Sequence, residues 1–190
     1  AKQNVNDLEI LINYTIEKYY PNIISSKNKA LDLLNVLIEK QTQLVIDWMR
    51  VGFIHGVMNT DNMSISGETI DYGPCAFMDS YNPKTVFSSI DQLGRYSYDN
   101  QPKIIKWNLT RFAECLIPLI SKNEDDAIKL ATNSLDNFEK NYENKWLNMM
   151  RDKLGLFGED SGDKNLIIEL LTWMNKKKAD YTNTFVFLMN

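Results

Sequence analysis

A regular spacing of apolar residues constrains the fold of this chain more than any other feature. Between Ser26 and Arg50, apolar side chains recur every three or four positions, and the charged residues lie largely off that stripe. This period predicts a long amphipathic helix whose apolar face packs into a core. Similar stripes predict further helices around residues 8–20, 102–120, 127–146, 166–174 and 181–188, so we expect a mainly α fold. The stripe of the long helix comprises Ala30, Leu34, Leu37, Leu44 and Trp48.

The composition argues against several classes of protein. With 190 residues and 44% hydrophobic content, the chain can bury the core of one domain. A formal charge of −4 and a pI near 5.1 argue against a nucleic-acid-binding protein. No run of about 18 apolar residues occurs in the sequence, so we expect no membrane segment.

Cysteine usage and overall residue preferences indicate a cellular location. Cys75 and Cys115 stand forty positions apart without a C-x-x-C pair, which indicates neither a zinc site nor a disulfide framework. We therefore expect a reduced, cytoplasmic protein. The richness in Lys, Asn and Ile is typical of an AT-rich bacterial genome.

Chemically informative residues gather within 52–101, where the helical period ends and Gly, Asn, Asp, Ser and Pro accumulate. The string HGVMNTDN runs from His55 to Asn62, and the string DYG begins nine residues later at Asp71. Protein kinases carry a catalytic loop H-R-D-x-x-x-x-N followed by D-F-G, in which the Asn and the second Asp hold magnesium ions. Here the His and the Asn keep that spacing, but Val57 stands where the kinase base Asp would be.

The segment from Met63 to Asp71 alternates apolar and polar residues around a Ser-Gly pair. This alternation predicts two short strands joined by a tight turn, which would fold Asp71 back toward Asn62. Magnesium takes near-octahedral oxygen ligands, commonly one or two protein side chains together with waters and phosphate oxygens. An amide oxygen from Asn62 and a carboxylate from Asp71 meet that need. Asp61 is then the nearest candidate to accept a proton from an attacking hydroxyl.

Each string also has a simpler interpretation. The run from Asn59 to Asn62 is an acceptable polar turn, because Asn and Asp side chains satisfy their own backbones in loops. A bare D-x-G is likewise compatible with a turn. Both strings together, in this order and separated by a hairpin pattern, favour a functional site. The single histidine, His55, follows apolar Phe53 and Ile54, and we interpret it as a buried, hydrogen-bonded scaffold residue and not as a base.

With these motifs in place, the chain resembles the selenoprotein O family, kinase-fold proteins once classed as pseudokinases. The resemblance is carried by HGVMNTDNMSISGETIDYGPCAFMDSYNP, by QLGRYSYDNQPKIIKWNLTRFAECLIPL and by DYTNTF. It implies protein adenylylation, in which ATP binds in an orientation flipped relative to ordinary kinases and AMP passes to Ser, Thr or Tyr hydroxyls of proteins. By position, Asp61 resembles the family's proposed base, and Asn62 and Asp71 resemble its ligands for Mg²⁺ or Mn²⁺. The absence of the kinase Asp at Val57 is then a family trait.

Other parts of a kinase-like fold are not recognisable. A glycine-rich phosphate loop, a strand Lys and a helix Glu should precede the catalytic loop, but only 54 residues precede His55 and their pattern is helical. The C-terminal extension of the family is not seen after Asn190. We therefore expect residues 1–190 to form a single helical domain, the C-lobe core of a longer kinase-like protein, with a small hairpin bearing the site. Such a fragment should be inactive alone, and an apolar surface left by the missing N-lobe could drive dimerisation.

Three functions compete at this stage. The preferred one is a part of a Mg-dependent protein adenylyltransferase with ATP as co-substrate and proteins as substrates. The second is a conventional phosphotransferase of the small-molecule kinase type, whose catalytic loop usually retains the Asp that is Val57 here. The third is a non-catalytic helical binding module. Labelled α- or γ-phosphate on the product would separate the first two.

Overall fold

The computed structural model describes residues 4–188 of the chain. Helices account for most of these residues, as the apolar periods predict. The α-helices are α1 (Val5–Tyr19), α2 (Lys29–Val51), α3 (Gln101–Ile120), α4 (Glu124–Leu154), α5 (Asp163–Lys177) and α6 (Tyr181–Phe187). Short 3₁₀ turns are η1 (Pro21–Ile23), η2 (Thr60–Asn62) and η3 (Tyr98–Asn100), and the two strands are β1 (Phe53–Ile54) and β2 (Ala76–Phe77).

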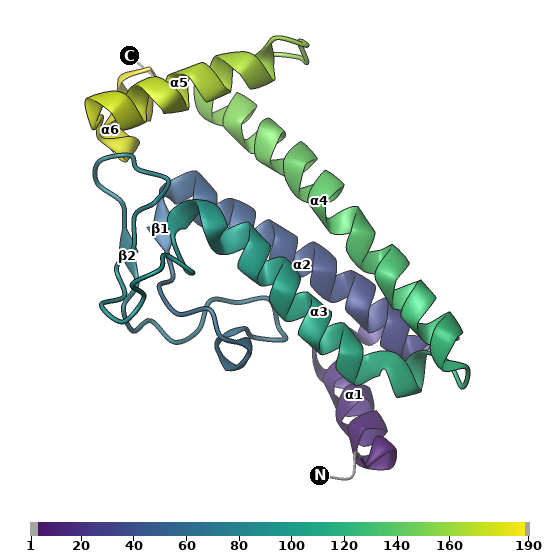
Figure 1. Cartoon of the computed structure of the whole chain (residues 1–190). Helices are drawn as coiled ribbons and strands as arrows, with labels where there is room; N and C mark the ends of the chain where they lie inside the picture. The colour runs from purple at the N-terminus through teal and green to yellow at the C-terminus, as the bar shows by residue number, and fades with distance from the viewer. Residues whose placement is uncertain (1–3, 189–190) are drawn as a thin grey trace.

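Three long helices, α2, α3 and α4, form the centre of the molecule. They run side by side over much of their length, with α1 at one end and the strands with their loops at the other (Figure 1). The predicted stripe of α2 lies in this core except for Leu44, which is only partly buried, and Leu33 and Val45 beside the stripe are fully buried. Leu116 of α3 and Ala127 of α4 are fully buried as well. Burial of apolar surface is the main favourable contribution to folding, so the contact between these three helices stabilises the fold on which the loops are held.

Helix ends are defined by side-chain caps and by glycines. The side chain of Asn28 accepts a hydrogen bond from the backbone N–H of Leu31 and caps α2, and Asn123 caps α4 in the same way through Asp126. Gly52 ends α2 in the left-handed conformation, at φ +73°. A side chain at Gly52 would also meet the ring of Tyr181, since a Cβ there would lie 2.8 Å from Cδ1 of that tyrosine.

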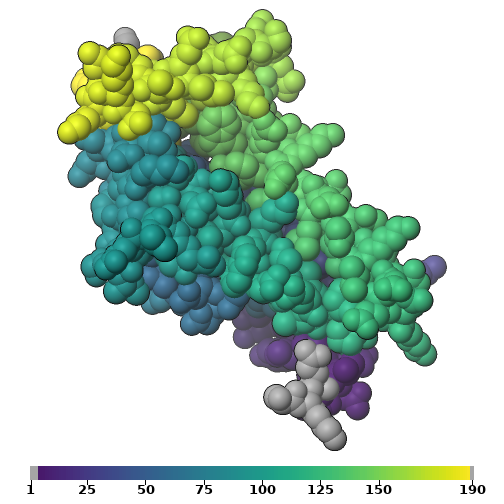
Figure 2. All heavy atoms as spheres, viewed as in Figure 1, coloured from purple at the N-terminus to yellow at the C-terminus, as the bar shows by residue number. Residues whose placement is uncertain are grey.

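The C-terminal helices fold back onto the loop region. The backbone N–H of Tyr81 donates to the carbonyl of Ala179 at 2.8 Å, and the N–H of Tyr181 donates to the carbonyl of Asp79 at 2.6 Å. Figure 2 shows the yellow end of the chain resting on the blue-green segment that contains these partners. The junction between α5 and α6 therefore covers one edge of the loop region.

The predicted hairpin from Met63 to Asp71 is only partly correct. The turn is present, since the N–H of Gly67 donates to the carbonyl of Ser64 at 3.1 Å and Gly67 has φ +79°. The ladder, however, shrinks to one antiparallel pair between Met63 and Thr69. The regular sheet lies elsewhere, where β1 and β2 pair with Phe53 opposite Phe77 and Ile54 opposite Ala76.

Side chains from α2 and from Tyr20 bind the turn of this hairpin to the helical core. Gln41 donates to the carbonyl of Ser64 at 2.7 Å, and the indole N–H of Trp48 donates to the hydroxyl of Thr69 at 2.9 Å. Tyr20, just after α1, donates to the carbonyl of Ile65, and burial together with the Glu68 carboxylate raises the pKa of this phenol. A longer ladder would pair Asn62 with Ile70, but the N–H of Asn62 donates to the carbonyl of Asn59 and the carbonyl of Ile70 accepts from the ring of His55. Among the described residues, no helix is long and apolar enough to cross a membrane.

Candidate functional site

The HGVMNTDN string begins at the buried end of β1 and emerges at the surface. His55 is 1% exposed and Met58 is 1% exposed, whereas Asn59, Thr60 and Asp61 are exposed. This burial confirms the interpretation of His55 as a scaffold residue. The first residues of the string are therefore buried and its last residues are exposed, and the exposed part, which we call the tip, carries the polar residues.

Asn62 closes the tip of the string by hydrogen bonds on both its backbone and its side chain. Its backbone N–H donates to the carbonyl of Asn59 at 3.0 Å, which forms η2. Its side-chain Nδ2 donates to the carbonyl of Val57 at 2.9 Å. Because a carbonyl can only accept, this contact fixes which end of the amide is nitrogen. The Oδ1 oxygen of Asn62 is left as the group available to a cation.

Asp71 lies in a backbone conformation that non-glycine residues rarely adopt, with φ +56°. The preceding carbonyl, that of Ile70, lies 2.8 Å from Nε2 of His55, and the N–H of Gly73 donates to the carbonyl of Asp71 at 2.8 Å. Such strained residues persist only when their surroundings hold them, and they cluster at functional sites. The observed φ therefore supports a functional reading of this aspartate.

Residues 55–57 connect the two halves of the candidate site. Asn62 bonds to the carbonyl of Val57, and the Asp71 segment bonds to the ring of His55. Gly56, at φ +88°, allows close approach of the second half, since a Cβ there would lie 2.8 Å from the carbonyl oxygen of Pro74. The structure thus bonds Asn62, and the residue before Asp71, to one three-residue segment. Their roles, and the role of Asp61 as base, stay predictions.

The two carboxylates of the site are free of partners. Among residues 4–188, neither Asp61 nor Asp71 has an ion pair or a side-chain hydrogen bond, and both residues are exposed. Within the same range, no three His, Cys, Asp or Glu residues gather into a metal-binding group. An amide oxygen and one or two free carboxylates are hard oxygen donors, which fits Mg²⁺ completed by waters and phosphate oxygens.

Two polar residues that the motif search did not select also hold this loop. Asn108 of α3, 5% exposed, donates through Nδ2 to the carbonyl of Met58 at 2.9 Å. Tyr96 donates its hydroxyl to Oδ1 of Asn59 at 2.7 Å. The signal for Asn108 was available, because it interrupts an apolar helix face between Ile105 and Leu109. Tyr96 carried no comparable signal.

Two arginines, Arg95 before α3 and Arg111 on α3, lie against the ring of Trp107 on α3. The guanidinium of Arg95 lies 5.0 Å from the ring centroid of Trp107, and that of Arg111 lies 5.4 Å from the same centroid. Arg111 also pairs with Glu114 at 2.7 Å. Each guanidinium thus makes a cation–π contact with the ring of Trp107.

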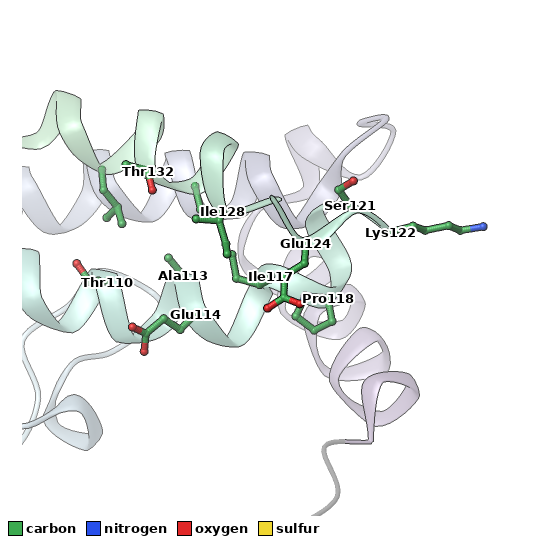
Figure 3. Close-up of a pocket in the computed structure, with 12 residues that line it drawn as sticks. Thr110, Ala113, Glu114, Ile117, Pro118, Ser121, Lys122, Glu124, Ile128 and Thr132 are labelled. Atoms are coloured by element: carbon green, nitrogen blue, oxygen red, sulfur yellow. The ribbon is translucent and has the colours of Figure 1, made fainter. Parts of the chain in front are cut away.

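Several cavities border α3, and one of the two described below touches the candidate site. A cavity of about 730 Å³ lies between the C-terminal half of α3 and the start of α4, lined by Ala113, Ile117 and Ile128 with Glu114 at its edge (Figure 3). None of the predicted site residues lines it. A smaller, largely apolar cavity of about 310 Å³ includes Thr60 and Met63, which flank Asp61 and Asn62.

Comparison with known proteins decides the family. The model of the family described as Protein adenylyltransferase SelO matches residues 1–190 of this chain. The chain belongs to this family. The Protein nucleotidyltransferase YdiU of Pelagibacter ubique is 88% identical over 190 residues, which cover 100% of this chain and 39% of that protein. Proteins of the same name from Alcanivorax borkumensis and Clostridium perfringens are 58% and 56% identical, over 94% and 97% of this chain and 37% and 38% of their own lengths.

The extent of these matches bears on what this SelO-family chain can do alone. It spans less than two fifths of the length of the relatives named above. The candidate site lies inside the matched region in each comparison that covers the whole chain. The name of the relatives specifies transfer of a nucleotide to protein, and it is consistent with the resemblance that the sequence motifs carry.

Proposed function

We propose that this chain supplies the metal ligands and the proton acceptor of a Mg-dependent protein adenylyltransferase. Membership of the SelO family supports the reaction class. The unpaired carboxylates of Asp61 and Asp71 and the free oxygen of Asn62 support the location of the site. We further propose that the helical core with its loop corresponds to the C-lobe of a kinase-like fold, and that the protein acts in the bacterial cytoplasm.

The proposed reaction is displacement at the α-phosphorus of ATP. A hydroxyl oxygen of a protein Ser, Thr or Tyr forms the new P–O bond, and the bond to pyrophosphate breaks. Asp61, exposed at the tip of the loop, accepts the proton of the attacking hydroxyl. Asn62 Oδ1 and the Asp71 carboxylate hold the metal, which, when bound, neutralises phosphate charge and stabilises charge that develops in the transition state.

The geometry of the site suits a ligand set that must not shift during the reaction. The side chain of Asn62 is held by its bond to Val57, and the backbone around Asp71 is held by the His55–Ile70 contact and by the turn to Gly73. Groups that are preorganised in this way need little rearrangement when charge develops. The observation that carries the proposal is the pair of exposed carboxylates without partners, Asp61 and Asp71, in a chain of the SelO family.

A metal held by Asn62 and Asp71 alone would leave much of the negative charge of the triphosphate uncompensated. We propose that the remaining length of the full protein supplies the groups that grip ATP, and that the 190-residue chain alone is inactive and binds metal–nucleotide weakly. Calorimetry of the isolated chain with ATP and Mg²⁺ tests this part. A tight signal that Asp71→Ala abolishes would contradict it.

Transfer of label tests the reaction class. Full-length protein that contains this chain is incubated with protein substrate and ATP labelled at the α- or the γ-phosphate. We expect α-label on protein, lost in Asp71→Ala and strongly reduced in Asp61→Ala, with Asp136→Asn on the exposed face of α4 as the matched control. The name of the relatives leaves the base open, so α-labelled UTP is compared with ATP.

Each other outcome has a definite meaning. Label from the γ-phosphate on the product would overturn the proposal in favour of a conventional phosphotransferase. An absence of both nucleotide binding and label transfer would leave a non-catalytic helical module. Unchanged α-label transfer in Asp71→Ala would keep the reaction and reject the site.

A further inference from the structure

The first residue of α3, Gln101, makes an unusual set of contacts. It is 0% exposed and lies beneath β1. Its Oε1 accepts the backbone N–H of His55 at 2.9 Å, and its Nε2 donates to the carbonyl of Phe53 at 3.0 Å. One side-chain amide thus bonds to the two backbone groups that a neighbouring strand would otherwise satisfy.

The orientation of this amide is fixed by its partners. The His55 N–H can only donate and the Phe53 carbonyl can only accept, so a flipped amide would face both with the wrong group. A buried amide with both ends satisfied is rigid, and losing either bond leaves a buried backbone group unpaired.

The backbone of Gln101 gives a second, independent sign that this residue is constrained. It adopts helical angles, φ −53° and ψ −45°, although Pro102 follows it. The ring of a proline disfavours the helical region for the residue before it. Gln101 makes its side-chain bonds to β1 from this conformation at the start of α3.

His55 passes the constraint on to the candidate site. Its Nε2 donates to the carbonyl of Ile70 at 2.8 Å, and its ring centroid lies 5.4 Å from that of Trp48. The ring can reach Ile70 only from the position that its own backbone sets. The residue after Ile70 is Asp71, in its left-handed conformation.

We propose that Gln101 is a positioning residue for Asp71. It fixes the backbone of His55, the His55 ring fixes the carbonyl of Ile70, and this contact holds Asp71 in the orientation that a metal ligand requires. The inference rests on the proposed function for the importance of Asp71 to metal binding. The mechanical link from Gln101 to Asp71 stands on hydrogen bonds alone and is tested separately.

Solution NMR on the 190-residue chain tests the link. Three signals are followed: the Nε2–H of His55, the backbone N–H of Gly73, which bonds to the Asp71 carbonyl, and the Asp71 amide during titration with Mn²⁺. Gln101→Met keeps the length of the side chain and removes both hydrogen bonds. We expect solvent exchange of the His55 and Gly73 protons to rise about tenfold, as the loss of one net hydrogen bond implies, and Mn²⁺ broadening at Asp71 to need several-fold more metal.

Thr42→Val is the matched control. Thr42 is fully buried on α2, and its hydroxyl bonds only within that helix, to the carbonyl of Ile38 at 2.6 Å. Thr42→Val should lower global stability. It should leave the exchange rates of the His55 and Gly73 protons and the Mn²⁺ titration at their wild-type values. If Gln101→Met does not fold, Gln101→Glu replaces it, since Glu keeps an oxygen for the His55 N–H and loses the donor to Phe53. In that variant we expect the His55 backbone N–H to stay protected from solvent exchange and the carbonyl of Phe53 to lose its side-chain hydrogen bond.

Three results separate the possibilities. If Gln101→Met behaves like Thr42→Val, with both exchange rates at wild-type values, the positioning role is overturned. If both rates rise and the metal titration weakens, the role is supported. If wild-type protein shows no Mn²⁺ broadening at Asp71 or Asn62, the proposed metal site fails, while the exchange rates still decide the role of Gln101.

Discussion

Nδ2 of Asn62 donates to the carbonyl of Val57 across a distance of 2.9 Å, and this bond ties the tip of the loop to its base. Val57 occupies the position at which a kinase loop would carry its catalytic Asp, and here it contributes its backbone carbonyl. The residue that departs from the kinase pattern is therefore part of the scaffold for a predicted metal ligand.

Asn62→Asp should separate charge from geometry at this position. A carboxylate cannot donate to Val57, so two acceptors would face each other and we expect a loss of about 1 kcal/mol in the free energy of unfolding. Urea denaturation at neutral pH measures it. Asn62→Ala is the comparison, because it removes the bond without adding a charge. Equal stability of Asn62→Asp and wild type would show that the Val57 contact contributes nothing.

Asp71→Asn should leave the fold intact and weaken metal binding. Asn tolerates the left-handed region at least as well as Asp, so the melting temperature should change little. The lost carboxylate should reduce Mn²⁺ affinity by roughly tenfold or more, as expected for a charged ligand replaced by a neutral one. Calorimetry and thermal unfolding on the same samples give both quantities. A large fall in melting temperature would show that the carboxylate itself stabilises the turn.

Gly56→Ala should damage the site from a position that carries no ligand. A Cβ at Gly56 would lie 2.8 Å from the Pro74 carbonyl, and the φ of +88° is unfavourable for alanine. We expect a loss of about 1–3 kcal/mol in stability, together with displacement of residues 71–74. Amide chemical shifts around Asp71 report the displacement. Gly155→Ala, at φ +64° with no neighbour within 4 Å, is the control for backbone strain alone.

Lys153 should make stability depend on pH in the alkaline range. Burial, with a smaller contribution from Arg50, lowers the pKa of this lysine to about 8, and its ammonium lies 4.3 Å from the ring centroid of Tyr181 and 4.0 Å from that of Phe185. Between this value and the ordinary lysine pKa, the unfolded chain binds the proton more than the folded chain does. Stability should therefore rise with pH across that window.

Urea denaturation at about pH 7 and about pH 9.5 measures this dependence. Lys153→Met should abolish the rise, because it removes the ammonium that titrates in this range. Lys140→Met, on an exposed position of α4, should keep the rise. A decrease in wild-type stability between the two pH values would contradict the prediction.

The helices could be predicted because each buries a continuous apolar stripe. The stripe of α2 ends at Gly52 as the sequence indicates, and α4 continues past the predicted end at Trp146 because Met149 and Met150 extend its buried face. The buried role of His55 could be predicted as well, since the residue follows two apolar residues of β1.

The strands could not be predicted, for a physical reason. The pairs of β1 and β2 are two residues long and 22 positions apart, so neither strand is long enough to show an alternating pattern. The predicted hairpin stops after one pair because the carbonyl of Ile70 bonds to the ring of His55 and the N–H of Asn62 bonds back to Asn59. Such hydrogen bonds depend on tertiary packing, which a local alternation of apolar and polar residues does not encode.

Amide side chains on α3 also have a consequence for protein engineering. Gln101 bonds to the start of the loop and Asn108 bonds to its middle, so a helix 40 or more residues downstream supplies hydrogen-bond partners for the loop backbone. A graft that moved only residues 53–77 into another scaffold would leave these backbone groups unpaired. Any transplant of the loop must bring the first two turns of that helix, in register, with it.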